Sequence, residues 1–162
     1  MELVKQTDFR HIHLTGCLFI CILDGVQEHF QKALTFEQIA YSYRHLVEQK
    51  VIDPDCYVNS YQSHNEIGNL ACSLLVKPDY EVLYIGKKDY RTPADSFGQK
   101  FGASFTVLHG ITEKGGHHFR QGDSAGLLIN DPYDPPPKII GESSLRYYVV
   151  KKRYRETIGR VV

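Results

Sequence analysis

The chain has 162 residues, and its 19 Lys and Arg residues balance its 19 Asp and Glu residues to a formal net charge of zero. This length suits one domain with its own core, and the balanced charge argues against a nucleic-acid or anionic-membrane partner. The longest apolar run, residues 17–23, is too short to cross a bilayer, and the N-terminus lacks the pattern of a signal peptide. Four cysteines are too few for a disulfide scaffold, so we expect reduced thiols and a cytoplasmic location.

The first half of the chain predicts three helices. Apolar residues recur at a spacing of four over residues 16–30, which predicts a broadly buried helix. Residues 35–38, Thr-Phe-Glu-Gln, form a capping box, so a second helix should begin after Thr35. A third helix is expected over residues 64–75, and residues 77–79, Lys-Pro-Asp, should end it.

The second half of the chain predicts strands separated by Gly, Pro and Asp turns. The expected strands cover residues 81–85, 104–109, 118–121, 127–130 and 146–150. Helices followed by such strands predict an α+β fold, with N-terminal helices packed on a C-terminal antiparallel sheet. We expect one domain over residues 1–152 and a basic tail over residues 153–162, and we expect residues 151–155 to be solvated and frayed.

Cys17 is the first candidate for chemistry, because it follows Gly16 and opens the apolar stretch of the first predicted helix. A thiol in the first turn of a helix lies at the positive end of the helix dipole, near unpaired backbone N–H groups. Both features favour the nucleophilic thiolate. An inert buried thiol is the alternative for Cys17. Cys21, one turn deeper among apolar residues, should be protonated and unreactive.

Candidate partners for this thiol lie far downstream. His117 and His118 stand at the start of one predicted strand, and Asn130 and Asp131 follow the next. A Cys, then a His, then an Asn or Asp is a chain order found in cysteine hydrolases, where the His is the base and the last residue orients it. The two strands flank a predicted hairpin loop, so side chains from them can be cross-strand neighbours.

Four segments together carry a resemblance to a known family: Gln6, Gly16-Cys17, His118-Phe119 and Asn130-Asp131-Pro132. In this order and spacing, the chain resembles the compact bacterial form of the papain-like cysteine peptidases. The best match is to peptidases that process bacteriocins with double-glycine leaders, and to their bacterial and prophage relatives. We do not carry over the leader-peptide substrate, because the nucleotide-driven export domains of those peptidases have no counterpart in these 162 residues.

The resemblance implies a papain-like fold and assigns four roles. Cys17 would be the nucleophile, His118 the general base and acid, Asp131 the residue that orients the imidazole, and Gln6 an oxyanion donor. Two of these assignments have a neighbouring alternative. His117 competes with His118, although successive strand residues face opposite sides and only one can reach Cys17. Asn130 is the substitute for Asp131, since an amide can also orient a histidine.

The predicted function is a cysteine-dependent hydrolase that cleaves a peptide or related amide bond. Its substrate would be a peptide, a protein or a peptidoglycan-type molecule, and no cofactor is expected. The first alternative is an inactive papain-like binding module. The second is a metal-binding domain, because His11, His13, Cys17, His109, His117 and His118 are residue types that bind zinc. The usual Cys-x-x-Cys and His-Glu-x-x-His signatures do not occur, which argues against a metal.

Overall fold

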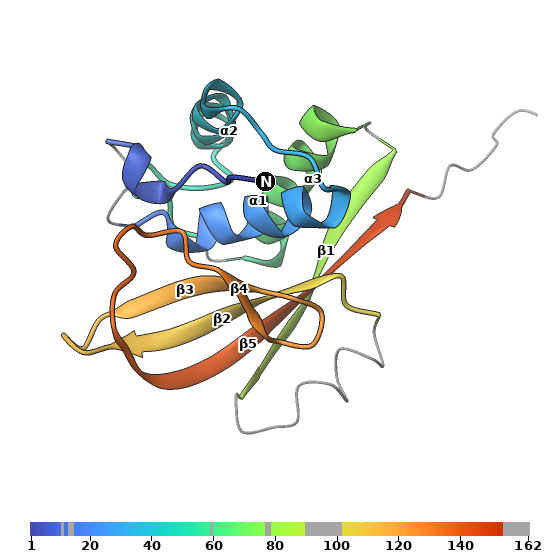
Figure 1. Cartoon of the computed structure of the whole chain (residues 1–162). Helices are drawn as coiled ribbons and strands as arrows, with labels where there is room; N and C mark the ends of the chain where they lie inside the picture. The colour runs from blue at the N-terminus through green and yellow to red at the C-terminus, as the bar shows by residue number, and fades with distance from the viewer. Residues whose placement is uncertain (11, 13–14, 59, 77–78, 90–101, 154–162) are drawn as a thin grey trace, which may run out of the picture.

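The computed structural model describes residues 1–10, 12, 15–58, 60–76, 79–89 and 102–153. In this part of the chain, three α-helices pack on a five-stranded antiparallel sheet (Figure 1). The predicted α+β class, with the helices first and the strands after them, is confirmed.

The helices begin close to the residues that the sequence predicts. A short 3-10 helix, η1 (Gln6–Asp8), precedes α1 (Cys17–Phe30), α2 (Phe36–Glu48) and α3 (Tyr61–Leu75). At the start of α2, Gln38 N donates to Thr35 Oγ1 at 3.1 Å and Thr35 N donates to Gln38 Oε1 at 2.9 Å, which confirms the capping box. The third helix starts earlier than predicted, because Ser60 Oγ accepts a hydrogen bond from Ser63 N at 3.0 Å and caps it. Its predicted stop falls partly on residues 77–78, which lie outside the described residues.

The strands are β1 (Tyr80–Asp89), β2 (Phe105–Thr112), β3 (His117–Gly122), β4 (Leu128–Asn130) and β5 (Ile139–Lys152). Their order in the sheet is β1-β5-β2-β3-β4, and all pairs are antiparallel. Figure 1 shows the three helices on one side of the molecule and β2, β3 and β5 on the other, with the segment after β4 crossing over toward the start of α1.

Two expectations about the last strand are wrong. The strand starts at Ile139 rather than at residue 146. Its backbone pairs with β2 through the polar residues 142–144, and this pairing does not depend on apolar side chains, on which the prediction is based. Lys151 and Lys152 belong to β5, where they pair with Glu81 and Tyr80 of β1, so they are not frayed. The rest of the predicted tail, residues 154–162, lies outside the described residues.

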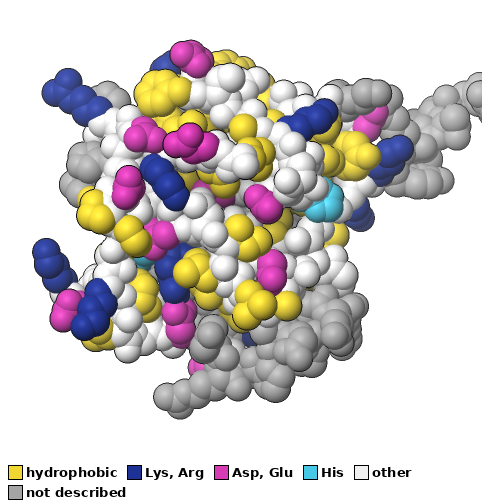
Figure 2. Space-filling view, viewed as in Figure 1, with side chains coloured by type: hydrophobic (Ala, Val, Ile, Leu, Met, Phe, Trp, Pro, Cys, Tyr) yellow, Lys and Arg dark blue, Asp and Glu magenta, His cyan; other side chains and the backbone are white. Residues whose placement is uncertain are grey.

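The core lies around α1, whose residues 17–27 are all buried. A Cβ atom at Gly25 would overlap the ring of Phe105, so α1 approaches β2 at a point that only glycine allows. This contact fixes α1 against the sheet and therefore fixes where its first residue, Cys17, lies. On the face seen in Figure 2, acidic, basic and hydrophobic side chains are interspersed. Within the described residues, no helix has the length and apolar character needed to span a membrane.

Candidate active site

The N-terminus of α1 places the Cys17 thiol. Gly16 precedes it, and a Cβ atom there would lie 2.7 Å from the carbonyl oxygen of Ile12, so a larger residue would push the helix start away. Ile20 N donates to Gly16 O at 2.9 Å in the first helical hydrogen bond, which leaves the N–H of Cys17 in the first turn, where no carbonyl of the helix can accept it. Cys17 is 8% exposed, and it lines a surface cavity.

His118 of β3 and Asp131, which directly follows β4, lie next to this thiol. His118 Nε2 is 2.7 Å from Asp131 Oδ1, and the Cys17 side chain lies close enough to the His118 ring to raise its pKa. Since Asp131 occupies Nε2, Nδ1 is the ring nitrogen left for the thiol. Tyr133 N donates to the same Oδ1 at 2.9 Å, which further fixes the carboxylate. The structure thus brings together three residues that are far apart in the sequence.

The surroundings of His118 favour its charged form. Burial acts to lower the pKa of this imidazole, but the hydrogen bonds to Asp131 and Cys17, together with their charges, outweigh burial and raise the pKa to about 9. At pH 7 the ring is therefore an imidazolium held between a carboxylate and a sulfur atom. A protonated ring donates from both nitrogens, which suits this pair of acceptors.

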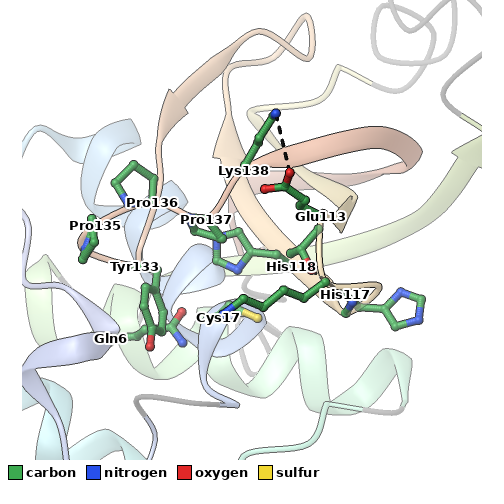
Figure 3. Close-up of a pocket in the computed structure, with 13 residues that line it drawn as sticks. Gln6, Cys17, Glu113, His117, His118, Tyr133, Pro135, Pro136, Pro137 and Lys138 are labelled. Atoms are coloured by element: carbon green, nitrogen blue, oxygen red, sulfur yellow. Dashed lines mark hydrogen bonds and ion pairs between the residues drawn. The ribbon is translucent and has the colours of Figure 1, made fainter.

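His117 points in another direction. Its Nδ1 lies 2.8 Å from His109 Nε2, on the neighbouring strand β2. Both histidines line the cavity, but Figure 3 shows the His117 ring directed away from Cys17. The alternation of side chains along β3 therefore separates the two candidates, and His118 is the one that interacts with the Cys17 side chain.

Asn130 contacts neither His118 nor Cys17 through a hydrogen bond among the described residues. Its Nδ2 donates to Asp24 Oδ2 at 2.7 Å, and its Oδ1 accepts from Lys5 Nζ at 2.6 Å. The geometry therefore places Asp131, and not Asn130, beside the imidazole.

Gln6, the first residue of η1, lines the same cavity. A polar residue this near the chain terminus is commonly exposed to solvent. It is 1% exposed, and its backbone N donates to Pro132 O at 2.8 Å, one residue beyond Asp131. Figure 3 shows Gln6 on the Cys17 side of the cavity, beside Tyr133.

The cavity in front of Cys17 has a volume of about 420 Å³. One wall is the segment that contains Tyr133 and Pro135 to Pro137, and the other is the turn between β2 and β3. An ion pair between Lys138 Nζ and Glu113 Oε1, 3.7 Å apart, joins the two walls at the rim (Figure 3). This space can hold part of a peptide-sized molecule against the thiol.

The other three cysteines are buried and free, like Cys17. Burial raises the pKa of the Cys21 thiol well above its ordinary range, with Asp24 adding to the effect. Burial also raises the pKa of Cys56, and it raises that of Cys72 to about 12. All three thiols therefore stay protonated near neutral pH.

In the described part of the chain, no group of three or more His, Cys, Asp or Glu side chains is arranged so that it could hold a metal ion. His11 and His13, which the metal alternative needs, lie outside the described residues. His109 and His117 approach each other, but burial lowers the pKa of His109, and the nearby cations Arg146, Lys87 and Arg120 lower it further. A cluster of cations is a poor environment for a metal ion.

The sequence-based reasoning missed Lys5 and Asp24, which surround Asn130. Nothing in the sequence singles out Lys5, a lysine near the N-terminus, but Asp24 carries one usable signal. Asp24 is a charged residue on a helix predicted to be buried on most sides, and a buried carboxyl needs partners.

Comparison with known proteins gives no match: no protein-family model, no curated protein and no solved structure matches the chain.

Proposed function

We propose that this protein is a cysteine hydrolase with a papain-like arrangement, which cleaves a peptide or a related amide bond. One observation carries the proposal: Cys17, at the start of a buried helix, interacts with the His118 imidazole, whose Nε2 is 2.7 Å from Asp131, and both Cys17 and His118 line a cavity. A purely structural role would not require a histidine in its charged form at the mouth of a cavity.

In the first half of the reaction, the Cys17 sulfur attacks the carbonyl carbon as a thiolate, paired with the His118 imidazolium, and the C=O electron pair moves to the oxygen. The N–H of Cys17 and the Gln6 side-chain amide are the donors for this oxyanion. One such donor is typically worth about 3 kcal/mol in the transition state. The tetrahedral species then breaks its C–N bond, and His118 gives a proton to the departing amine. The product is a thioester on Cys17.

In the second half, His118 is neutral and accepts a proton from a water molecule that attacks the thioester. The C–S bond breaks, the acid leaves, and the proton on His118 restores the imidazolium beside the sulfur. Throughout the cycle, Asp131 holds the ring orientation and offsets its charge. The wall of Tyr133 and the prolines would contact the substrate on one side of the reacting bond.

The proposal is tested by the reactivity of the thiol. Iodoacetamide at pH 7 should alkylate Cys17 faster than Cys21, Cys56 and Cys72, as mapped by mass spectrometry of peptides. His118→Ala should slow the alkylation of Cys17, and His117→Ala is the matched control, since its ring faces the other way. A Cys17 thiol no more reactive than the other three would favour the inactive binding module. Zinc retained by the purified protein would favour the metal-binding domain.

A further inference from the structure

Lys5 lies at the junction between the N-terminal segment and the end of β4. Its ammonium donates to Asn130 Oδ1 at 2.6 Å and to the backbone oxygen of Asp131 at 2.6 Å. The next residue, Gln6, adds the backbone bond from its N to Pro132 O. Three bonds thus fasten residues 5–6 to residues 130–132, more than 120 positions away in the sequence.

Asn130 extends this connection to α1. Its Nδ2 donates to Asp24 Oδ2 at 2.7 Å, and Gln27 Nε2 donates to the other oxygen of the same carboxyl at 3.2 Å. Asp24 and Gln27 are completely buried, and Gln27 is fixed in turn by Leu34 N, which donates to its Oε1 at 2.7 Å. Buried polar groups held in this way have few alternative arrangements.

The connected segments carry three of the four candidate residues, and the fourth, His118, lies on β3. The helix α1 carries Cys17, η1 carries Gln6, and the segment after β4 carries Asp131, which contacts His118. A single ammonium therefore bridges the segment with the oxyanion donor and the segment with the orienting carboxylate. A small displacement between such segments costs a large part of a catalytic rate.

We propose that Lys5 is a positioning residue, which keeps Asp131 and Gln6 aligned with Cys17 by bridging Asn130 Oδ1 and the Asp131 carbonyl. The effect of Lys5 on catalysis rests on the hydrolase function proposed above. Without the ammonium, two acceptors at the end of β4 lose their donor, and the Asp131 carboxylate, still held by Tyr133 N, is less firmly fixed against His118 Nε2.

The test compares Lys5→Met, Lys5→Arg and the control Lys32→Met, which removes a lysine on an exposed loop. The readout is the titration of the His118 ring, followed by nuclear magnetic resonance. Charge alone predicts that removing a nearby cation raises the pKa of His118. Loss of positioning predicts the opposite, a pKa lower by about one pH unit in Lys5→Met, because Asp131 no longer holds the ring. Lys5→Arg should retain most of the original value, and Lys32→Met all of it.

The rate of Cys17 alkylation at pH 7 should fall roughly tenfold in Lys5→Met and recover in Lys5→Arg. If Lys5→Met does not fold, Asn130→Ala removes one of the two partners and should change both readouts in the same direction. A folded Lys5→Met protein with an unchanged or raised His118 pKa overturns the positioning role. An unreactive Cys17 in the wild-type protein overturns the hydrolase instead, and the His118 titration still decides the role of Lys5.

Discussion

Replacing Asp131 by alanine should lower the pKa of His118 strongly. The wild-type value is about 9, against an ordinary 6.5, and this difference corresponds to about 3 kcal/mol in favour of the imidazolium. The His118 side chain is only 6% exposed, so solvent screens these interactions little. Because burial opposes the charged form, Asp131 and Cys17 together must supply more than this net amount. Asp131 contributes both a hydrogen bond at 2.7 Å and a charge.

We therefore expect the pKa of His118 to fall below about 7.5 in Asp131→Ala, while Asp131→Asn keeps part of the effect through its amide oxygen. The assay is a nuclear magnetic resonance titration of the imidazole signals, with His118→Gln used to assign the His118 signal among the eight histidines. A His118 pKa that stays near 9 in Asp131→Ala would refute the reasoning. A His118 pKa that falls in Asn130→Ala but not in Asp131→Ala would move the orienting role to Asn130.

Three further outcomes are expected. Gln6→Ala should lower the rate of acyl transfer to Cys17 by about 10²-fold while the alkylation of Cys17 by iodoacetamide, which forms no oxyanion, changes little; equal losses in both rates would contradict the oxyanion role. Gly25→Ala should destabilise the protein by about 1–3 kcal/mol, measured by urea unfolding, because its methyl group overlaps the Phe105 ring; an unchanged unfolding midpoint would contradict this packing. The raised pKa of His118 adds stability that is fully present below pH 6.5 and is lost as the pH rises through about 9, so the stability difference between wild type and His118→Gln should shrink by about 3 kcal/mol over this range; a difference independent of pH would contradict it.

Much of the architecture could be predicted because it depends on local patterns. The Thr35 capping box and the apolar spacing of residues 16–30 each involve neighbours within one or two turns, and both match the structure. The start of α3 was missed because its cap, Ser60, precedes the apolar pattern by several residues. The first residues of β5 were missed because their pairing with β2 depends on backbone groups, which carry no side-chain signal.

In the candidate site too, the features that depend on contacts between distant segments could not be predicted from local patterns. The alternation of side chains along a strand requires that only one of His117 and His118 face Cys17, but the choice depends on the register of β3 with β2. The bridge through Lys5 joins residues 125 and 126 positions apart. Such a contact follows from the way the segments pack, and no spacing within a single sequence indicates it.

The most direct test of the account is whether Cys17 forms and releases an acyl group. The protein would be mixed with p-nitrophenyl acetate at pH 7, nitrophenolate release would be followed continuously, and samples quenched in acid would be mapped by mass spectrometry. The account predicts an acetyl thioester on Cys17, continued turnover, and loss of both in Cys17→Ala and His118→Ala but not in His117→Ala. Release at the same rate in wild type and Cys17→Ala, with no acetyl group on Cys17, would contradict it.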